Sequence, residues 1–494
     1  MNPPKPSQRA LLAGLATRAM LERGLRPTFS AEALAELSQI RPPDVAAALK
    51  ADPAIRDLRG GLWASVDNDD SRDLDQLSMA EALPTGQTRI WVAVADVDVL
   101  VPIGSALDEQ AGHNTSTVYT PAMIFSMLPE RLSTDLTSLN EGVDRLAMVV
   151  EMVIDAQGAL QSAEVYRAAV CNRAKLAYNS LAAWLDGDGP LPAAASAVDG
   201  LDEVLQLQDR AGQRMSLSRR MHGALTLETV GGWAVFEDDI LRAMEFDRKN
   251  RATQMVENFM IAANGATARF LASHKFASIR RVVLEPQRWD RIVELAGTYG
   301  VKLPGAPNSL ALEEFLLKQK ALDRLRFPDL SLTIVKLLGA GEYMAELPDD
   351  PIPDHFGLAA RDYTHSTAPN RRYPDLITQR LLKAALAGQP TPYPLPELHA
   401  LAEHCTQQED DVNKVERQAS KSAVALLLSA RIGQRFEALV TGASPKGTWV
   451  RLLDIPVEGR LAADFSGLDV GDRVRVELTA VEIERGFIDF KRRK

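Results

Sequence analysis

The chain has 494 residues, of which 46% are hydrophobic and 25% charged, a composition typical of a globular protein. This length is too great for one ordinary core. The net charge of −10 is at first sight unfavourable for a nucleic-acid partner. No apolar stretch approaches the roughly 20 residues needed to cross a bilayer, and the start of the chain lacks a signal-peptide core. The two cysteines provide neither a disulfide framework nor a zinc site, so we expect a cytoplasmic protein with no membrane partner.

Residues 1–62 are predicted to form a small helical domain of the winged helix-turn-helix type. Helical periodicity covers 8–23, 31–37 and 43–50. The stretch 55–63, with two adjacent glycines, is predicted to be the two-stranded wing. Such domains bind nucleic acid in most cases and otherwise contact proteins.

The next feature is a cluster of five aspartates within the nine residues 67–75. Carboxylates this close repel one another unless a positive charge lies among them, and oxygen ligands suit Mg²⁺ or Mn²⁺. The cluster follows an apolar run at 61–66 and precedes a strand-like stretch at 89–97 that contains another acid, Asp96. Acids at rigid strand ends favour a metal-dependent phosphodiester enzyme, and a metal-free acidic surface loop is the alternative.

Long helices follow in the middle of the chain, which we assign to one large domain over 63–430. Helices are predicted over 201–221, 251–274 and 397–430, and a Pro-rich connector over 389–396. Short β-type runs alternate with these helices.

Residues 431–494 are predicted to form a β-barrel. Strands are expected at 435–440, 448–453, 473–481 and 487–490, and the spacing of Gly and Val residues is similar to an OB-fold of the ribosomal S-one type. Such barrels bind single strands by stacking, and Trp449 is our candidate for this contact, with core packing as the alternative. Both 1–62 and 431–494 carry a small basic excess around an acidic centre, which is typical of RNA-contacting modules around a metal site.

Several motifs, taken in order, resemble the catalytic domain of the ribonuclease II family, the RNB domain. The resemblance covers roughly residues 63–430, and it is specific because the motifs keep their order over that length. The matching motifs are Asp67 with Asp73-Leu-Asp75, Ala95-Asp-Val97, Val118-Tyr119, Met127-Leu-Pro129, Leu132, Leu136, Ser138-Leu139, Ala174-Lys-Leu-Ala-Tyr178, Met255-Val-Glu-Asn-Phe-Met-Ile-Ala-Ala-Asn264 and Pro369-Asn-Arg-Arg-Tyr-Pro-Asp375.

The resemblance implies an α+β catalytic domain and a processive 3′→5′ exoribonuclease that hydrolyses single-stranded RNA to nucleoside 5′-monophosphates. It implies Mg²⁺, with Mn²⁺ as a substitute, and we expect a monomer. The implied metal ligands are Asp67, Asp73 and Asp75, of which Asp75 is also catalytic. Arg371 is expected to face the scissile phosphate, and a structural salt bridge is the alternative that fits Arg372 better. The implied RNA contacts are Tyr119, Tyr178, Glu257 and Glu416, with a core position as the alternative for each tyrosine and a solvated helix face for Glu416.

The chain also departs from the family pattern. The fourth aspartate of the cluster is replaced by Gln76, a weaker ligand for Mg²⁺, and Ala93 replaces a usual histidine. The family commonly carries cold-shock OB-folds at its amino-terminal end, and the sequence shows none. The replacement at Gln76 leaves a second hypothesis, a catalytically weakened RNB protein that binds RNA or regulates a partner.

Overall fold

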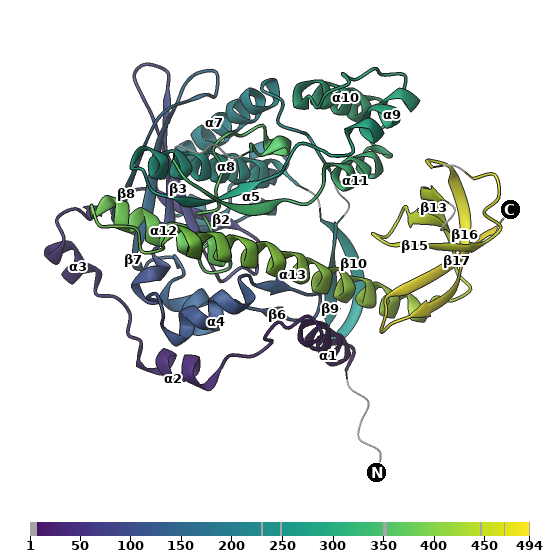
Figure 1. The fold of residues 1–494 in the computed structure, drawn as a ribbon, viewed down its shortest axis with the longest axis horizontal. Helices are drawn as coiled ribbons and strands as arrows, with labels where there is room; N and C mark the ends of the chain where they lie inside the picture. Colours follow the sequence, from purple (N-terminus) through teal and green to yellow (C-terminus); the bar gives the residue numbers. More distant parts are fainter. Residues whose placement is uncertain are drawn as a thin grey trace, which may run out of the picture.

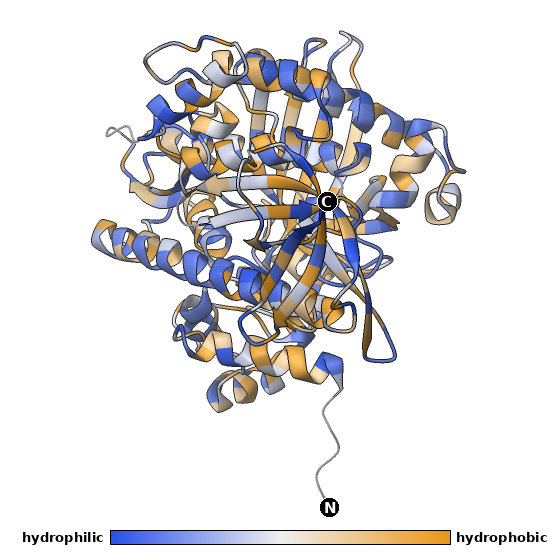
Figure 2. Ribbon diagram, turned by 90° about the vertical axis from the view of Figure 1, so that its right-hand side faces the viewer, coloured by the Kyte–Doolittle hydropathy of each residue, from blue (hydrophilic) through white to orange (hydrophobic). Residues whose placement is uncertain are grey.

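This computed structural model describes residues 7–228, 231–247, 249–348, 353–444, 447–468 and 470–493. They form a large α+β body and a small β-barrel at one end, and the long helix α13 (Leu395–Ser429) runs from the body to the barrel (Figure 1). Hydrophobic and hydrophilic residues alternate along the barrel strands around the carboxyl terminus (Figure 2). The α+β class and the carboxyl-terminal barrel are therefore as predicted.

The body is built on a six-stranded sheet with the order β1-β8-β2-β3-β4-β7. The long strand β8 pairs with β7 along its first part and with β2 along its last part, so these two strands and β3 and β4 close into a ring with it. The bounds are β1 (Arg56–Asp57), β2 (Trp63–Asp67), β3 (Gln76–Ala82), β4 (Thr88–Ala95), β7 (Asp144–Ile154) and β8 (Leu160–Ala177). The ring brings the ends of β2 and β4 close to the start of β3, and thus gathers the aspartate cluster.

Helices α7 and α8 pack on each other and on this sheet, and α12 contacts both α8 and α13. The prediction for α7 agrees with the structure, and those for α8 and α13 agree within two residues at each end. The bounds are α4 (Ala106–Asn114), α5 (Tyr178–Asp186), α6 (Ala193–Ser196), α7 (Leu201–Met221), α8 (Arg251–Ser273), α9 (Trp289–Thr298), α10 (Ser309–Leu322), α11 (Phe327–Leu338) and α12 (Tyr373–Leu386). In the described ranges, no helix combines the length and apolar character needed to cross a membrane.

Within the residues that the structure describes, three two-stranded sheets lie outside the main sheet, and one of them extends towards the barrel. Their strands are β5 (Val118–Tyr119) with β6 (Ile124–Phe125), β9 (Gly231–Glu237) with β10 (Ile240–Asp247), and β11 (Ser278–Val282) with β12 (Glu342–Glu346). The β9–β10 hairpin shares an apolar core with α1, the end of α13 and the barrel. The body and the barrel are therefore joined by packing as well as by the chain.

The amino-terminal prediction is wrong in its wing and in the packing of its helices. The three helices exist, as α1 (Gln8–Leu21), α2 (Ala31–Gln39) and α3 (Val45–Ala51), and Ser30 caps α2 by accepting the N–H of Ala33. However, α1 packs on α13, α2 on α4 and α3 on β7. The residues expected to form the wing are β1 and β2, which both pair with β8 in parallel. Long-range pairing thus overrides the local hairpin signal.

The carboxyl-terminal strands close into a barrel with the order β13-β14-β15-β17-β16. The bounds are β13 (Arg435–Ser444), β14 (Gly447–Leu452), β15 (Glu458–Ala463), β16 (Arg473–Glu482) and β17 (Phe487–Arg493), of which β15 was not predicted. Gly459 is required there, because a Cβ atom would lie 2.5 Å from the ring of Phe490 and 2.8 Å from the carbonyl of Ile488. Arg451 fixes the barrel to the body through two hydrogen bonds to Asp329 of α11, at 2.9 and 2.7 Å.

Candidate active site

Asp75 lies at the centre of the aspartate cluster, immediately before β3. Its carbonyl accepts the N–H of Ala95 at 3.0 Å, which places it opposite the end of β4. The carboxylate is completely buried, with Oδ1 accepting the N–H of Asn370 at 3.1 Å and Oδ2 accepting Nε–H of Arg371 at 2.9 Å. Burial raises the pKa of Asp75 to about 7 against the opposing effect of Arg371, and the Asp73 carboxylate adds to the increase. Such a strongly shifted acid is typical of a functional site.

Arg371 connects this buried acid to the protein surface. Its N–H donates to the carbonyl of Ala368 at 3.1 Å and its own carbonyl accepts the N–H of Thr117 at 3.0 Å, so the backbone is held from two sides. The side chain remains 34% exposed although it bonds to a buried carboxylate. A planar guanidinium fixed in this way has N–H groups suited to a phosphate.

The neighbouring Arg372 forms a salt bridge with Asp375 at the start of α12. Its Nε and Nη2 donate to the two carboxylate oxygens of Asp375 at 2.8 and 2.7 Å. The Asp375 carboxylate is fully buried and also accepts the N–H of Ala368 at 2.8 Å. This pair fixes the start of α12. Arg371 also pairs with a buried carboxylate, that of Asp75, but it does so through Nε alone, so the phosphate role expected for Arg371 stays a prediction.

Asp67 and Asp73 extend the cluster on the side of β2. Asp67 ends β2 opposite Ala177 of β8 and accepts the N–H of Asn68 at 2.8 Å. Burial raises the pKa of Asp73, Arg371 opposes the change, and the Asp67 carboxylate adds to it. The three expected aspartates therefore lie within electrostatic reach of one another and of Arg371.

The cluster fits a hard cation in its ligand chemistry but is not arranged as a complete metal site. Across the described residues, no three Asp, Glu, His or Cys side chains form a group that could hold an ion. Asp75 is already bonded to Arg371, which leaves Asp67 and Asp73 as the more accessible carboxylates. Burial is the main cause of the raised pKa values of Asp73 and Asp75, and a neighbouring carboxylate adds to each increase, so a further positive charge beside them would favour their ionised forms. Carboxylate oxygens that lack a counter-charge are the ligands that Mg²⁺ takes.

Tyr119 and Glu416 meet at the edge of this site. The N–H of Tyr119 donates to Oε1 of Glu416 at 2.8 Å, so α13 holds strand β5. The Tyr119 side chain is 42% exposed, and partial burial raises the pKa of its hydroxyl to about 12 against the effect of Arg371. Burial also raises the pKa of Glu416. Tyr119 is therefore close to Arg371 and still accessible, whereas Glu416 is partly buried and already bonded.

Tyr178 lies beside the aspartates, and Glu257 has no direct link to them. Tyr178 begins α5 directly after Ala177, and burial raises its pKa with a further increase from Asp67. Glu257 lies on α8, where it accepts Nζ–H of Lys249 at 2.8 Å and is 39% exposed. Glu257 acts electrostatically on Arg219, and it is not among the charges that shift the pKa of Asp73 or Asp75.

Trp449 is far along the chain from this centre, on strand β14 of the barrel. The residues before and after it, Thr448 and Val450, are buried, whereas Trp449 is half-buried and lies outside the barrel core. Its ring covers Gly447, where a Cβ atom would lie 3.2 Å from the indole. The alternation of the strand thus places Trp449 on the outer face of the barrel, and its stacking role stays a prediction.

The structure also shows contacts of residues for which the sequence suggested either no role or a different position. Asn370, which was not singled out, donates its N–H to Asp75 and accepts Oγ1–H of Thr137 at 2.5 Å. Gln76 donates its side-chain N–H to the carbonyl of Thr367. Asp96 does not join the cluster, because its buried carboxylate pairs with Lys383 at 3.0 Å and Arg167 at 3.4 Å. The Asn370 contact could have been anticipated only from its place beside Arg371.

Comparison with known proteins gives two family matches along the chain. The RNB domain matches residues 55–388, and the RNase II-type exonuclease C-terminal S1 domain matches residues 434–493. Ribonuclease R of Vibrio cholerae is 30% identical over 473 residues, covering 88% of this chain and 56% of that protein. Ribonuclease R of Escherichia coli is 29% identical over 470 residues, covering 88% and 57%. The chain therefore spans little more than half the length of these relatives.

Solved structures share the fold over nearly the whole chain. Mycoplasma genitalium RNase R in complex with ribose-methylated single-stranded RNA superposes with a TM-score of 0.87 at 23% identity, covering 98% of this chain and 78% of that one. Yeast Ssd1, described as a pseudonuclease, superposes with a TM-score of 0.73 at 16% identity, covering 94% and 57%. At such identities these likenesses establish the fold and not the activity.

Proposed function

This chain belongs to the RNB-domain family, and from that premise we propose that it is a processive 3′→5′ exoribonuclease that hydrolyses single-stranded RNA to nucleoside 5′-monophosphates. The observation that carries the proposal is the contact between the buried Asp75 and the accessible Arg371 inside a crowded aspartate cluster. Relatives named Ribonuclease R support the same reaction class.

In this proposal Arg371 binds the scissile phosphate. Its guanidinium is fixed at Nε by Asp75, and its backbone is held by Thr117. The positive charge is therefore already oriented when the phosphate binds. Asp75 positions the arginine and, with Asp73, supplies the negative charge of the site. Tyr119 and Tyr178 offer ring faces to the terminal bases, and Glu257 and Glu416 offer acceptors for ribose hydroxyls.

We also propose Mg²⁺ as the cofactor, with Mn²⁺ able to replace it. Asp67, Asp73 and Asp75 would hold it together with phosphate oxygens of the substrate, and when bound the ion lowers the pKa of water and neutralises phosphate charge. The chain's own residues then have three tasks: to bind the RNA end, to orient the phosphate at Arg371 and to keep the cluster partly screened from solvent. We further propose that the protein acts as a cytoplasmic monomer.

The test is incubation of the purified protein with 5′-labelled oligo(A) and Mg²⁺, with an Asp75→Asn variant and an EDTA sample as controls. We expect progressive shortening from the 3′ end to a short limit product and release of AMP. A protein that binds the oligonucleotide without shortening it would be the catalytically weakened RNA-binding or regulatory protein that Gln76 suggests. Internal cuts would contradict the exonuclease assignment.

A further inference from the structure

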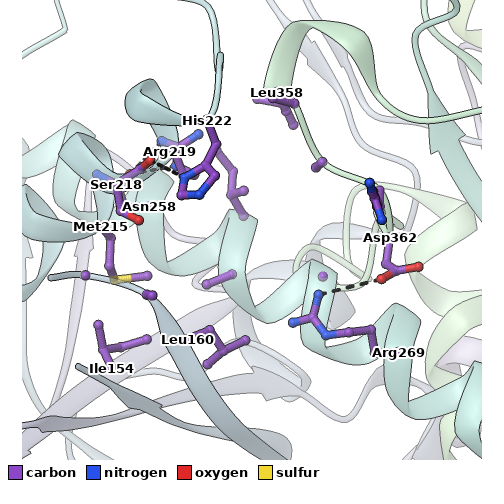
Figure 3. Close-up of a pocket in the computed structure, with 18 residues that line it drawn as sticks. Ile154, Leu160, Met215, Ser218, Arg219, His222, Asn258, Arg269, Leu358 and Asp362 are labelled. Carbon is purple, nitrogen blue, oxygen red and sulfur yellow. Dashed lines mark hydrogen bonds and ion pairs between the residues drawn. The ribbon is translucent and has the colours of Figure 1, made fainter. Parts of the chain in front are cut away.

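A cavity of about 420 Å³ opens between α7, α8, the β7–β8 turn and the segment 358–362 (Figure 3). None of the residues assigned to the candidate active site lines it. Its volume is in the range of small-molecule sites, and its walls are mostly apolar with a few polar groups directed inward. It therefore has the properties of a second binding site.

One face of α8 forms the floor of this cavity. Asn258, Ala262, Gly265 and Arg269 recur at intervals of three or four residues, so they lie along one side of the helix. The two small residues in the middle create the hollow. At Gly265 a Cβ atom would lie 3.3 Å from both Nη1 of Arg269 and the carbonyl of Asp362. The polar residues at the two ends of this face therefore border an apolar centre.

Arg219 provides a fixed positive charge at one end. Its Nε and Nη2 donate to Oδ1 of Asn258 at 3.2 and 2.5 Å, and Asn258 is itself oriented by a hydrogen bond to the carbonyl of Gln254 at 2.7 Å. Over the ranges that the structure describes, Arg219 forms no ion pair with a carboxylate. Burial lowers the pKa of Arg219, with Glu257 opposing this effect from a distance. A partly buried cation held by a neutral amide is stabilised when an anion binds beside it.

His222 lies next to Arg219 and completes this end of the cavity (Figure 3). Its Nδ1–H donates to the carbonyl of Ser218 at 2.7 Å, so Nε2, on the opposite side of the ring, donates to an anion when the imidazole is protonated. Between this end and the far end, the side chains of Ile154, Leu160, Met215 and Leu358 form the apolar walls. Such walls accept a flat ring next to the anion.

The far end carries a guanidinium and a carboxylate together. Arg269 and Asp362 face each other at 3.9 Å, a loose ion pair in which the Arg269 side chain remains 49% exposed. Because Asp362 partly neutralises Arg269, this end suits the neutral donors and acceptors of a heterocycle better than a second phosphate. Arg361 also lines this end but is exposed, whereas Arg219 is partly buried and has no carboxylate partner among the described residues, so Arg219 offers the stronger site for an anion.

We propose that this cavity binds a nucleoside 5′-monophosphate, with the phosphate at Arg219 and His222 and the base between the apolar walls, directed towards Arg269 and Asp362. The choice of a nucleotide among organic anions rests on the proposed function, because that reaction releases such molecules beside the protein. The binding itself depends only on the cavity and can be measured without any hydrolysis.

The test is equilibrium dialysis of the full-length protein with labelled AMP in EDTA, with adenosine and inorganic phosphate as competitors. We expect saturable binding, with competition by either fragment at least tenfold weaker than by AMP. Arg219→Gln, which keeps a donor for Asn258, should weaken AMP binding about tenfold, since it removes a charged hydrogen bond. Ala262→Leu, which fills the hollow without changing charge, should weaken it as well. Arg210→Gln, an exposed position on α7, removes the same charge outside the cavity and should have no effect.

Four outcomes would overturn the proposal. They are absence of AMP binding, inorganic phosphate competing as well as AMP, AMP binding that both cavity variants leave unchanged, and AMP binding that Arg371→Ala abolishes instead. If Arg219→Gln weakens binding of oligo(A) but the protein does not bind AMP, the cavity contacts RNA and the nucleotide assignment is wrong. Hydrolysis of oligo(A) without AMP binding would reject this site alone, and AMP binding without hydrolysis would reject the proposed function alone.

Discussion

Asp75 in the body and Glu477 in the barrel both bond to an arginine, yet their environments shift their pKa values in opposite directions. The pKa of Asp75 is raised to about 7 because it is fully buried with one guanidinium and a neighbouring carboxylate. The pKa of Glu477 is lowered to about 2 by hydrogen bonds from Arg493 at 2.7 Å and from Lys491 at 2.9 Å. Ionised Glu477 therefore supports folding, whereas ionisation of Asp75 disfavours the folded state as the pH rises through about 7.

This contrast teaches how to separate a functional acid from a structural one. An acid placed where its charge is unfavourable is maintained for something other than stability, and the crowded cluster around Asp75 has that character. An acid among several cations at an accessible edge only supports its own strands. Substitution of Asp75 should therefore change the reaction more than the stability, and substitution of Glu477 should change only the stability.

The largest effect is expected from Asp75→Asn. The amide keeps the shape of the side chain but cannot hold Arg371 by charge, so we expect hydrolysis of oligo(A) to fall by at least a hundredfold, equivalent to about 2.7 kcal/mol. RNA affinity should stay the same, because other residues, such as Tyr119, Tyr178 and Trp449, are proposed to contact the RNA. Asp70→Asn, an exposed acid of the same segment, is the matched control and should change the rate less than twofold. If Asp75→Asn keeps a tenth of the wild-type rate, Asp75 is not the key acid.

Exchanging the two adjacent arginines for other residues should separate chemistry from folding. Arg371→Lys replaces the planar fork by a point charge, so we expect the single-turnover rate to fall by about tenfold or more with little change in Tm. Arg372→Gln leaves the buried Asp375 without its counter-charge and should lower the stability by about 3 kcal/mol. Thermal unfolding and single-turnover kinetics of both variants decide this. Equal losses of Tm would remove the distinction.

Trp449 is the barrel residue whose substitution should affect RNA binding. The half-buried ring of Trp449 is outside the barrel core. Trp449→Ala should therefore weaken oligo(A) binding about tenfold, as expected for the loss of one stacked base. The single-turnover rate at saturating RNA should not change. Trp449→Phe keeps an aromatic face and should restore most of the affinity. Fluorescence anisotropy measures the binding. A lower rate at saturation with unchanged affinity would contradict the assignment.

Gln76→Asp tests the neutral position of the cluster. The added carboxylate should lower the Mg²⁺ concentration for half-maximal activity by a few-fold, since affinity for such ions rises with ligand charge. The same change removes the donor to the carbonyl of Thr367, so Tm should decrease modestly. Gln76→Asn, which keeps an amide without adding charge, is the control. An unchanged or higher Mg²⁺ midpoint in Gln76→Asp would mean that other ligands hold the ion.

The smallest effect is expected from Glu477→Gln. Because the folded pKa is lowered, the contribution of Glu477 is complete above the pKa of an unfolded glutamate, about 4.3, and is lost as the pH falls towards 2. The difference in Tm between wild type and variant should therefore be about 2 °C or less at pH 6 and should vanish with acidification. RNA hydrolysis at pH 7 should not change. A difference that grows on acidification would reverse this interpretation.

The sequence predicted those parts of the fold that depend on local signals. The apolar periodicity of 201–221 is sufficient to define α7, and the alternation around Val450 defines β14. The wing failed because β1 and β2 each find their partner in β8, about a hundred residues away, and nothing in the adjacent glycines reveals that competing strand. Pairing at such a distance is set by the whole sheet.

In the candidate site, too, local sequence signals predicted some contacts and long-range packing determines the others. The spacing of Asp67, Asp73 and Asp75 brings them together because they lie on one turn between two paired strands. Asp96 looked equivalent in sequence, yet α12 brings Lys383 to it. Arg371 and Arg372 are adjacent in the chain, yet Arg371 bonds to Asp75 and Arg372 bonds to Asp375. This difference depends on the three-dimensional path of the turn and cannot be read from the sequence. The cavity above α8 has no sequence signal, since its floor is made of ordinary small residues.

Helix α13 has a mechanical consequence for the molecule. Its 35 residues form a rod of about 50 Å. Near its start Leu398 and Cys405 are buried in the core of the body, and near its end Ala425 and Leu428 are buried with the barrel strands. Between these anchors Glu416 holds the N–H of Tyr119. The helix therefore links the barrel mechanically to the edge of the aspartate cluster, through the bond between Glu416 and Tyr119.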